Sequence, residues 1–360
     1  MALLERYILR EYLKIFSLAL AALVIVYLMI DFFEKIRRFV EYGASPLPVL
    51  TFFLLKLPKI IFEMTPLALL FATILVLGYF SKTNEITALK ASGVNLLKVM
   101  TPLLGLGVVV GFVLLIANTS LIAMANRESK MIKQTQIEKK PQTAYFRQSR
   151  VWLRLDSRTF FNVQLIEPSQ QAMYGVSLYR LTPDFTLQEM LEAKELRYQN
   201  GEWILVNGVQ RTFSPDRTLH IEEFETRTLV LNRRPEDFQQ VMLREDEMTY
   251  GELQRYQERL SRDGFNARRY QVELSSRAAL PFVSFIMVLV GIPSGLRGGP
   301  RAGLAKGIGL CLVIALVYLF FLSLSLSLGR GGVLHPLLAA WLPNLTFLAI
   351  GAYLLLQIRQ

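Results

Sequence analysis

Six long apolar runs constrain the fold of this chain more than any other feature of its sequence. They form two groups of three, one toward each end of the chain, and a polar stretch separates the groups. A helix that crosses a membrane needs about 20 consecutive apolar residues. The runs cover residues 12–33, 51–80, 99–124, 274–296, 303–328 and 333–356. We therefore predict an α-helical membrane bundle of six transmembrane helices, three plus three, with a domain inserted between the halves.

The composition supports a membrane protein over a soluble one. Hydrophobic residues make up 52% of the 360 residues and charged residues only 19%. The single cysteine, Cys311, lies inside an apolar run and has no second cysteine for an intrachain disulfide. The first apolar run is longer than the roughly 7–15 residues of a cleavable signal. We interpret it as a signal anchor and first span.

Lysine and arginine in the short loops indicate how the chain is oriented. Cytoplasmic loops of membrane proteins carry an excess of these residues. With six spans, one side of the membrane receives the two termini and two short loops, whose basic residues are Arg6, Arg10, Lys14, Lys82, Lys90, Lys98, Arg297, Arg301, Lys306 and Arg359. We therefore place both termini in the cytoplasm and the polar domain outside, in the periplasm of a cell with two membranes. The loop with Lys35, Arg37 and Arg38 also lies outside and departs from the rule.

The polar stretch has the pattern of a β domain. Residues 174–179 alternate between apolar and polar, and Asn200-Gly201 between two strand-like runs indicates a hairpin, because both residues tolerate the positive φ of a tight turn. A further strand pair is expected around Ser214-Pro215-Asp216. Several short strands with turn residues between them are typical of a sandwich or jelly roll. We predict a periplasmic, jelly-roll-like domain at residues 136–245.

The helical parts flank this domain. Residues 1–135 are predicted to hold the first three spans, with a cytoplasmic helix at 81–93, and residues 246–360 to hold a linking helix and the last three spans. Thr249 and Glu252 have the spacing of a capping box, which begins a helix by pairing a hydroxyl and a carboxylate with backbone N–H groups.

Motifs for catalysis are missing from the sequence. The only histidines are His220 and His335, and no group of His, Cys and Asp has metal-ligand spacing. The chain has neither a Gly-x-Ser-x-Gly turn nor a phosphate-cradling P-loop. We therefore expect no catalytic residue, metal, cofactor or nucleic-acid partner. Any ATP hydrolysis would belong to another chain.

Basic residues at the outer ends of the spans are the sharper functional signal. They are Lys35, Arg37, Arg38, Lys56, Lys59, Arg127, Lys130, Lys133, Arg268, Arg269 and Arg277. Anionic lipids of the cytoplasmic leaflet cannot account for cations on the outer side. Such cations suit an anionic, phosphorylated amphiphile in the outer leaflet. The alternative is that they snorkel to the interface or pair with Glu34, Glu41, Glu63 and Glu128.

The cytoplasmic segment 81–93 is a second signal. It is helix-prone, with Ile86 and Leu89 three residues apart, a cap at Ser81 or Thr83, and Gly93 as its end. A short helix of this kind can dock into a groove of a cytoplasmic partner, with Glu85 seeking a basic residue. The alternative is an interfacial helix without a partner.

Several motifs resemble one known family. They are Leu57-Pro58-Lys59, Thr65-Pro66-Leu67, the segment 84–93 with its Ala-Ser-Gly ending, Leu4-Glu5-Arg6-Tyr7-Ile8, and Arg269-Tyr270-Gln271. Together with the layout of the whole chain, they are similar to the LptF/LptG (YjgP/YjgQ) permeases of lipopolysaccharide export. The Ala-Ser-Gly ending, the Arg-Tyr-Gln and the last three spans are more similar to the LptG side of the family.

The resemblance implies a transmembrane subunit of an ABC transporter in the bacterial inner membrane. Such a subunit extracts lipopolysaccharide from the outer leaflet and passes it to a periplasmic bridge. The implied partners are an LptB-type ATPase dimer, an LptF-type paralogous permease, an LptC-type single-span protein and an LptA-type bridge. The runner-up hypothesis is a scaffold that transmits the motion of an ATPase and carries no substrate.

The resemblance also implies roles for individual residues. The family's coupling helix contacts the ATPase through its glutamate, which places that role on Glu85, within a helix that includes Ile86, Leu89, Ser92 and Gly93. The family's contacts with lipopolysaccharide phosphates fall on Arg37, Arg38, Lys59, Lys130 and Lys133. LptG proteins often carry a basic residue where this chain has Asp31. Lys35, one helical turn further on, is the candidate substitute.

Overall fold

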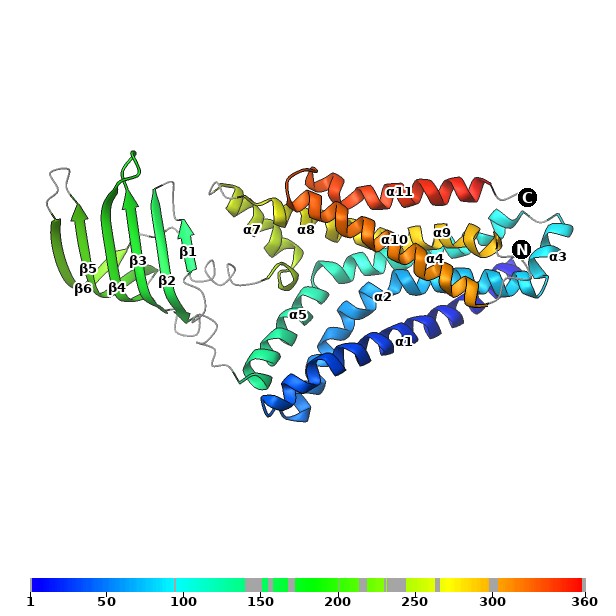
Figure 1. The fold of residues 1–360 in the computed structure, drawn as a ribbon, viewed down its shortest axis with the longest axis horizontal. Coiled ribbons are helices and arrows are strands. Elements are labelled where there is room, and N and C mark those ends of the chain that lie inside the picture. The colour runs from blue at the N-terminus through cyan, green and yellow to red at the C-terminus, as the bar shows by residue number, and fades with distance from the viewer. Residues whose placement is uncertain are drawn as a thin grey trace.

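The computed structural model describes most of the chain as a helical bundle joined to a β-sheet (Figure 1). The described residues are 2–93, 95–139, 151–154, 158–167, 172–199, 201–213, 219–229, 231, 244–262, 266–297 and 304–357. Figure 1 shows the sheet beyond one end of the bundle, and the short helix α3 (Glu85–Ala91) lies at the opposite end.

Six helices of the described residues are long and apolar enough to cross a membrane, which confirms the predicted spans. They comprise α1 (Ala2–Glu41), α2 (Pro46–Lys82), α4 (Leu96–Thr119), α8 (Arg268–Ala279) continuing through η5 (Leu280–Phe282) into α9 (Val283–Arg297), α10 (Leu304–Arg330) and α11 (Pro336–Leu356). The fourth span changes to a 3₁₀ turn at Pro281, since proline lacks the N–H that an α-helix needs at that position.

Shorter helices lie where the bundle faces the sheet. Helix α4 ends at Thr119, and α5 (Leu121–Ile132) and the π-helical turn η1 (Lys133–Ile137) continue the chain. On the return path, η4 (Glu245–Glu247) leads into α7 (Tyr250–Arg262). The predicted capping box is confirmed: Thr249 N donates to Glu252 Oε2 at 2.8 Å, and Glu252 N donates to Thr249 Oγ1 at 3.4 Å.

Helix α2 is the centre of the bundle. The buried hydroxyl of Tyr12 on α1 bonds both the carbonyl of Leu69, at 3.0 Å, and the hydroxyl of Thr73, at 3.1 Å. On another side, Gly291 of α9 lies so close to Thr73 that an added Cβ would stand 2.8 Å from the threonine Cβ. Small residues allow this close approach of helices in a membrane. The bundle is thus held by close packing around α2.

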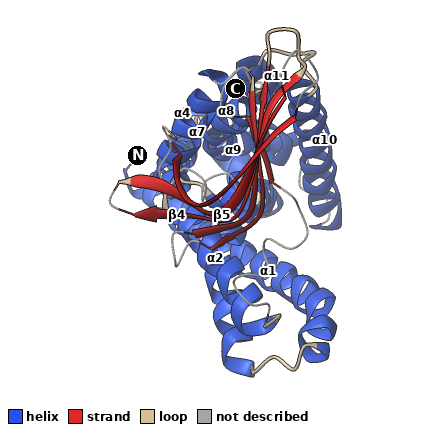
Figure 2. Ribbon diagram, turned by 90° about the vertical axis from the view of Figure 1, so that its left-hand side faces the viewer, coloured by secondary structure: helices blue, strands red, loops and turns tan. Residues whose placement is uncertain are grey.

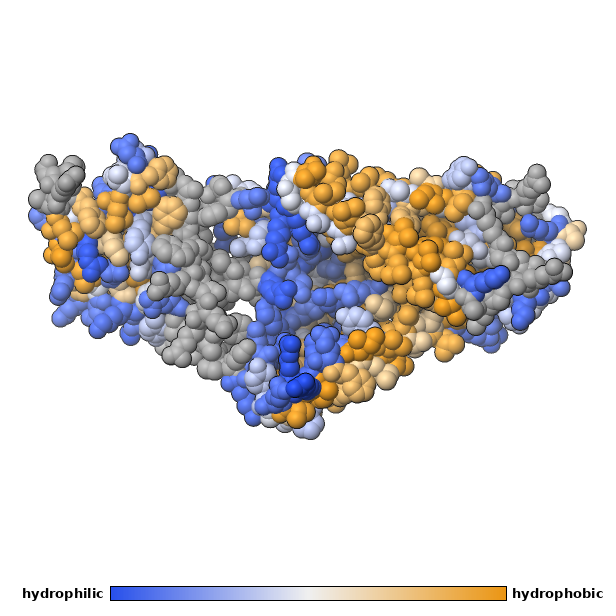
Figure 3. All heavy atoms as spheres, viewed as in Figure 1, coloured by the Kyte–Doolittle hydropathy of each residue, from blue (hydrophilic) through white to orange (hydrophobic). Residues whose placement is uncertain are grey.

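The flanks of the bundle are apolar. Figure 3 shows a broad hydrophobic region over the visible flank and hydrophilic surface toward both ends. Large exposed apolar side chains of the bundle include Leu18, Ile25, Phe112, Leu316 and Phe320. Apolar flanks with polar ends are what a helical bundle presents to lipid and water respectively.

The inserted domain is one antiparallel sheet in the described residues. Its strands are β1 (Val151–Arg154), β2 (Thr159–Glu167), β3 (Ala172–Leu181), β4 (Leu187–Gln199), β5 (Glu202–Phe213) and β6 (Leu219–Leu229), paired in sequence order. Figure 2 shows that the sheet curves strongly. The sheet confirms the predicted combination of a helical membrane bundle with an inserted β domain.

The predicted hairpin joins β4 and β5. Tyr198 pairs with Trp203 and Gln199 with Glu202, and Gly201 has a φ of +90°. Asn200 itself lies outside the described residues, as does the predicted turn at Ser214-Pro215-Asp216. Trp203 and Phe161 are fully buried in the core of the sheet. Of β5, Trp203 and Leu205 lie in this core, and the alternation ends at Asn207, which is exposed and has a φ of +53°.

Candidate functional site

Four basic residues from three helical segments surround the acidic turn η4. Lys59 of α2 pairs with Asp246 (Nζ to Oδ2, 3.5 Å), and Lys130 of α5 pairs with Glu247 (Nζ to Oε1, 2.6 Å). From α8, Arg269 pairs with Glu245, and Arg277 donates to the carbonyls of Glu245, at 2.5 Å, and Met248, at 2.7 Å. We call Lys59, Lys130, Arg269 and Arg277 the clamped group. The structure thus brings Lys59 and Lys130 together, as two of the predicted substrate contacts.

The surroundings of η4 shift the pKa values of two nearby carboxyl groups in opposite directions. Burial raises the pKa of Glu245, and the charge of Arg269 only partly offsets this effect. Burial acts in the same sense on Glu252, but the hydrogen bonds from Thr249 and the charge of Arg127 outweigh it and lower the pKa of Glu252. Glu252 therefore stays ionised and stabilises the start of α7.

The remaining predicted contacts lie at the C-terminal end of α1 and beside it. Arg37 pairs with Glu41 (Nε to Oε1, 3.2 Å) on its own helix, and its side chain is 88% exposed. Arg38 is exposed as well. We call Arg37 and Arg38 the exposed pair. Lys133 pairs with Glu138 at 3.6 Å in the adjoining turn. Arg37 therefore faces water, whereas Arg277 of the clamped group is itself buried and Lys130 pairs with a buried carboxylate.

Lys35 pairs with the buried carboxylate of Asp31 on its own helix. The carboxylate of Asp31, which is only 7% exposed, contacts Lys35 through Oδ1 and Lys56 through Oδ2, the latter at 2.7 Å. The ammonium of Lys56 also lies 5.3 Å from the centre of the Phe52 ring. Asp31 therefore links α1 to α2 through its ion pair with Lys56. Lys35 is paired with the same carboxylate in this structure.

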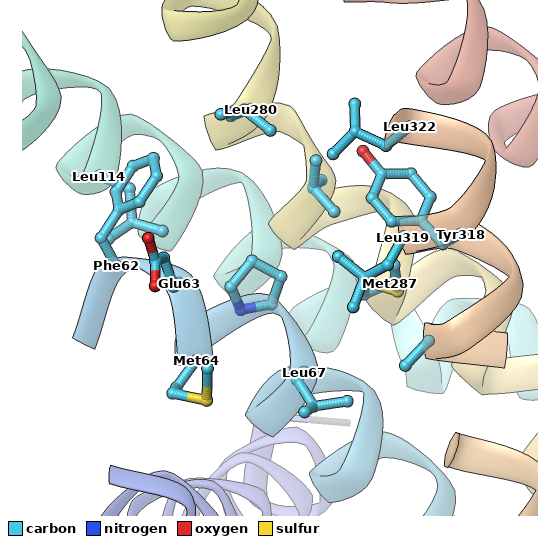
Figure 4. Close-up of a pocket in the computed structure, with 13 residues that line it drawn as sticks. Phe62, Glu63, Met64, Leu67, Leu114, Leu280, Met287, Tyr318, Leu319 and Leu322 are labelled. Carbon is cyan, nitrogen blue, oxygen red and sulfur yellow. The ribbon is translucent and has the colours of Figure 1, made fainter. Parts of the chain in front are cut away.

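An apolar cavity of about 420 Å³ lies along α2 next to Lys59. Figure 4 shows Phe62 and Glu63 of α2 near Leu114 of α4, with Met287 of α9 and Tyr318 of α10 farther along the wall. The other lining residues are Met64, Pro66, Leu67, Leu280, Val283, Ala315, Leu319 and Leu322. Glu63, one helical turn from Lys59, is the only charged member of this lining. The cavity suits an apolar chain, and a cation lies just beyond its charged end.

The wall of the cavity is fixed by hydrogen bonds behind it. Tyr318 donates to the side-chain oxygen of Asn344 on α11 at 2.7 Å, and Asn344 donates to the carbonyl of Ala279 at 2.7 Å. All three groups are buried. The polar atoms of Tyr318 and Asn344 are thus satisfied within the bundle, which leaves the ring of Tyr318 as an apolar wall.

Helix α3, at the opposite end, carries the predicted coupling residues Glu85, Ile86 and Leu89, and Ser92 and Gly93 follow its last residue. Glu85 accepts a hydrogen bond from the Thr83 hydroxyl at 2.7 Å, while Ile86 is buried in the core formed by α1, α2 and α4. Leu89 packs against the same core. Ser92 and Gly93 are exposed, and Gly93 has a φ of +71°. The predicted cap at Ser81 or Thr83 is wrong: Asn84, with a φ of +59°, precedes the helix, and Ser81 belongs to α2.

The acidic partners in η4 were missed by sequence reasoning. Arg37 pairs with Glu41, one of the four glutamates considered, but Lys59 and Lys130 pair with Asp246 and Glu247. The sequence feature that could have indicated these partners is the acidic run 245–247, at the point where the chain returns to the bundle. Within the described residues, no group of three or more His, Cys, Asp or Glu side chains could hold a metal ion.

Known proteins resemble this chain over nearly its full length. A profile of the family described as "Lipopolysaccharide export system permease LptF/LptG" matches residues 6–357. Two relatives, both described as "Lipopolysaccharide export system permease protein LptG", come from Escherichia coli strains K12 and O6:H1. Each is 22% identical to this chain over 367 residues, and the alignment covers 98% of both chains. The similarity therefore includes both groups of spans and the inserted sheet.

Proposed function

The chain belongs to the LptF/LptG family of lipopolysaccharide export permeases, and from this premise we propose that it extracts lipopolysaccharide from the outer leaflet of the inner membrane. It does so as a transmembrane subunit of an ABC transporter and passes the lipid to a periplasmic bridge. The family membership confirms the resemblance drawn from the motifs at 57–59, 65–67 and 84–93.

The observation that carries this proposal is the apolar cavity whose charged lining residue, Glu63, lies one helical turn from the cation of Lys59. Lipopolysaccharide combines acyl chains with phosphate groups, so it needs an apolar wall and positive charge side by side. The cavity between α2, α4, α9 and α10 supplies the wall. Lys59 lies one turn beyond Glu63, and the exposed pair lies at the end of α1. Arg37 and Arg38 are available to a phosphate without breaking a buried contact.

The six residues predicted to contact lipopolysaccharide therefore differ in how readily they can bind its phosphates. Arg37 and Arg38 meet the phosphates first, and Lys59 meets them at the cavity. Lys35, Lys130 and Lys133 are engaged by Asp31, Glu247 and Glu138 in this structure. They contribute only if the substrate exchanges for those carboxylates.

The orientation follows from the short-loop charges. Both termini and α3 lie in the cytoplasm, and the sheet lies in the periplasm, where it receives acyl chains and hands them to an LptA-type bridge. An LptF-type paralogue closes the open side of the cavity, and an LptC-type protein contributes its single span. Helix α3 meets an LptB-type ATPase dimer, since this chain has no P-loop.

Coupling works through a rigid connection from α3 to the bundle. Ile86 and Leu89 are packed in the core that α1, α2 and α4 share, so a displacement of α3 moves these helices with it. Glu85 and the exposed end at Ser92 and Gly93 remain as the contact surface for the ATPase. ATP binding in the partner pushes α3, narrows the cavity and expels the lipid toward the sheet.

Site-specific photo-cross-linking tests the substrate assignment. A photoreactive residue in place of Leu67 or Leu322, both in the cavity lining, is expected to cross-link to lipopolysaccharide, and ATP is expected to reduce the yield. The matched control replaces Val313 of α10, which is exposed on the flank. Equal yields at the three positions would contradict the proposal and favour the scaffold.

A charge change in α3 tests the coupling. Glu85→Arg is expected to abolish co-purification of a soluble ATPase, because it places a cation opposite a basic partner. Thr87→Ala, at an exposed position of the same helix, is the control and is expected to retain the ATPase. A Glu85→Arg protein that still couples ATP hydrolysis to export would remove Glu85 from the interface.

A further inference from the structure

The two ion pairs between the acidic turn η4 and the lysines differ in distance and in exposure. Glu247 is 6% exposed and lies 2.6 Å from the Lys130 ammonium, whereas Asp246 is 42% exposed and lies 3.5 Å from that of Lys59. The second carboxylate oxygen of Asp246 lies 3.7 Å from the exposed Arg244 side chain. A close pair with a buried partner is hard to break, while an exposed pair exchanges readily. Of the two acids, Asp246 is therefore the one that can release its cation.

The backbone of the turn is fixed, so release is a movement of the Asp246 side chain alone. Arg277 donates to the carbonyls of Glu245 and Met248, and the Asn126 amide donates to the carbonyl of Asp246 at 3.0 Å. The capping box at Thr249 begins α7 immediately afterwards. Asp246 stays beside Lys59 after its carboxylate has turned away, and it is positioned to return.

We propose that Asp246 is an internal anion that competes with the substrate's phosphate for Lys59 and Arg244. The inference rests on the proposed function, since it takes Lys59 as a phosphate contact. A carboxylate and a phosphate oxygen satisfy an ammonium in the same way, through short charge-assisted hydrogen bonds. When the cavity is empty, Asp246 occupies Lys59. When a phosphate arrives, Asp246 gives way, and its return helps to expel the phosphate at the end of the cycle.

Competition between Asp246 and phosphate predicts a different pattern of affinities from simple repulsion between their negative charges. If Asp246 must leave before any phosphate binds, its removal strengthens binding of every phosphate-bearing lipid by one common factor. Repulsion instead scales with ligand charge, and a phosphomonoester carries about −1.5 to −2 at pH 7. For an exposed ion pair the common factor is about two- to fivefold.

The test is equilibrium binding to Asp246→Asn in the full chain with its co-purifying subunits. The complex is placed in phosphatidylcholine nanodiscs with a chelator, and cross-linking from position 67 reports occupancy as probe lipid is added. The probes are lipid A, dephosphorylated lipid A, phosphatidylglycerol and inorganic phosphate. Glu222→Gln, which breaks an exposed pair with Arg227 on the sheet, is the matched control.

The expected result is an equal gain of about two- to fivefold for lipid A and phosphatidylglycerol, and none for dephosphorylated lipid A or for the control variant. Inorganic phosphate, titrated against lipid A, is expected to become a better competitor by the same factor. The gain disappears when Lys59→Gln and Arg244→Gln are also present. A larger gain in affinity for lipid A than for phosphatidylglycerol would mean that charge repulsion, and not competition, explains the effect of Asp246. Weaker binding would overturn the proposal and indicate that Asp246 holds the phosphate through a cation.

Failure of the proposed function is recognised separately. If Lys59→Gln in the otherwise unchanged chain leaves lipid A binding intact, then Lys59 is not a phosphate contact, and the substrate assignment at this position fails. If Lys59→Gln weakens binding but Asp246→Asn does not strengthen it, the substrate assignment stands and the competition is disproved.

Discussion

The clamped group and the exposed pair carry the same type of charge at the same side of the bundle, but the structure uses them differently. Lys130 lies against a carboxylate that is 6% exposed, whereas the side chain of Arg37 is 88% exposed and pairs with Glu41 on its own helix. Removing a partner from a buried pair leaves an uncompensated charge, while an exposed pair contributes little to stability. A basic residue at the end of a span is thus either an anchor or an available charge, depending on what faces it.

Lys130→Ala is expected to have the largest effect. It leaves Glu247 buried without its cation and destabilises the protein by about 3 kcal/mol. The thermal midpoint in detergent measures this loss. Lys130→Met combined with Glu247→Met is expected to recover most of it, because the pair is then replaced by apolar side chains. An unchanged thermal midpoint for Lys130→Ala would mean that Lys130, like the exposed pair, contributes little to stability.

Asp31→Asn is expected to come next, with a loss of about 2 kcal/mol. The change removes the carboxylate that Lys35 and Lys56 share and sets two cations side by side. Adding Lys56→Met is expected to restore the thermal midpoint, since one of the two cations is then gone. If the double variant is no more stable than the single one, the tie between α1 and α2 does not depend on this charge pair.

Neutralising the exposed pair is expected to affect the substrate but not the fold. Arg37→Gln with Arg38→Gln removes two cations from water, so the thermal midpoint stays within the range of about 0.5 kcal/mol that is usual for surface changes. Cross-linking of lipopolysaccharide is expected to fall about tenfold, because charge-assisted hydrogen bonds to phosphate are lost. A lower thermal midpoint with unchanged cross-linking would mean that Arg37 and Arg38 stabilise the fold and do not bind the substrate.

The smallest expected effect concerns the start of α7, which follows the acidic turn of the clamped group. The pKa of Glu252 lies below its ordinary value of 4.5. Its contribution to stability is therefore fully present above about pH 4.5 and is lost as the pH falls through the lower, folded-state pKa.

Glu252→Gln is expected to cost about 0.5 kcal/mol at pH 7, because the amide keeps the capping bond but loses the negative charge near the helix N-terminus. The difference between wild type and variant is expected to shrink as the pH falls below 4.5. Thermal midpoints of both proteins between pH 7 and pH 3 measure this. A difference that stays constant over that range would mean that the carboxylate charge has no part in the cap.

Local patterns in the sequence account for most of the fold. The six spans follow from apolar runs of sufficient length, because lipid accepts a backbone only when its polar groups are satisfied within the helix. The capping box at Thr249 and the β4–β5 hairpin follow from residues within a few positions of one another. The family resemblance likewise rests on short motifs. These features need no knowledge of which helices meet.

The partners of the charged residues were decided by the tertiary structure. Lys59 and Asp246 are 187 positions apart in the chain, and Lys130 and Glu247 are 117 apart, so no spacing rule links them. The nearer glutamates were plausible partners by sequence, but the return of the chain at η4 brings other carboxylates to these lysines. The burial of Ile86 is similar, since the apolar side of α3 faces the bundle only because α1, α2 and α4 meet there. The sequence alone determined which segments lie in the membrane, because that depends on local hydrophobicity. Only the packed structure decided which charges are free to act, because ion pairing depends on distances between segments that are far apart in the chain.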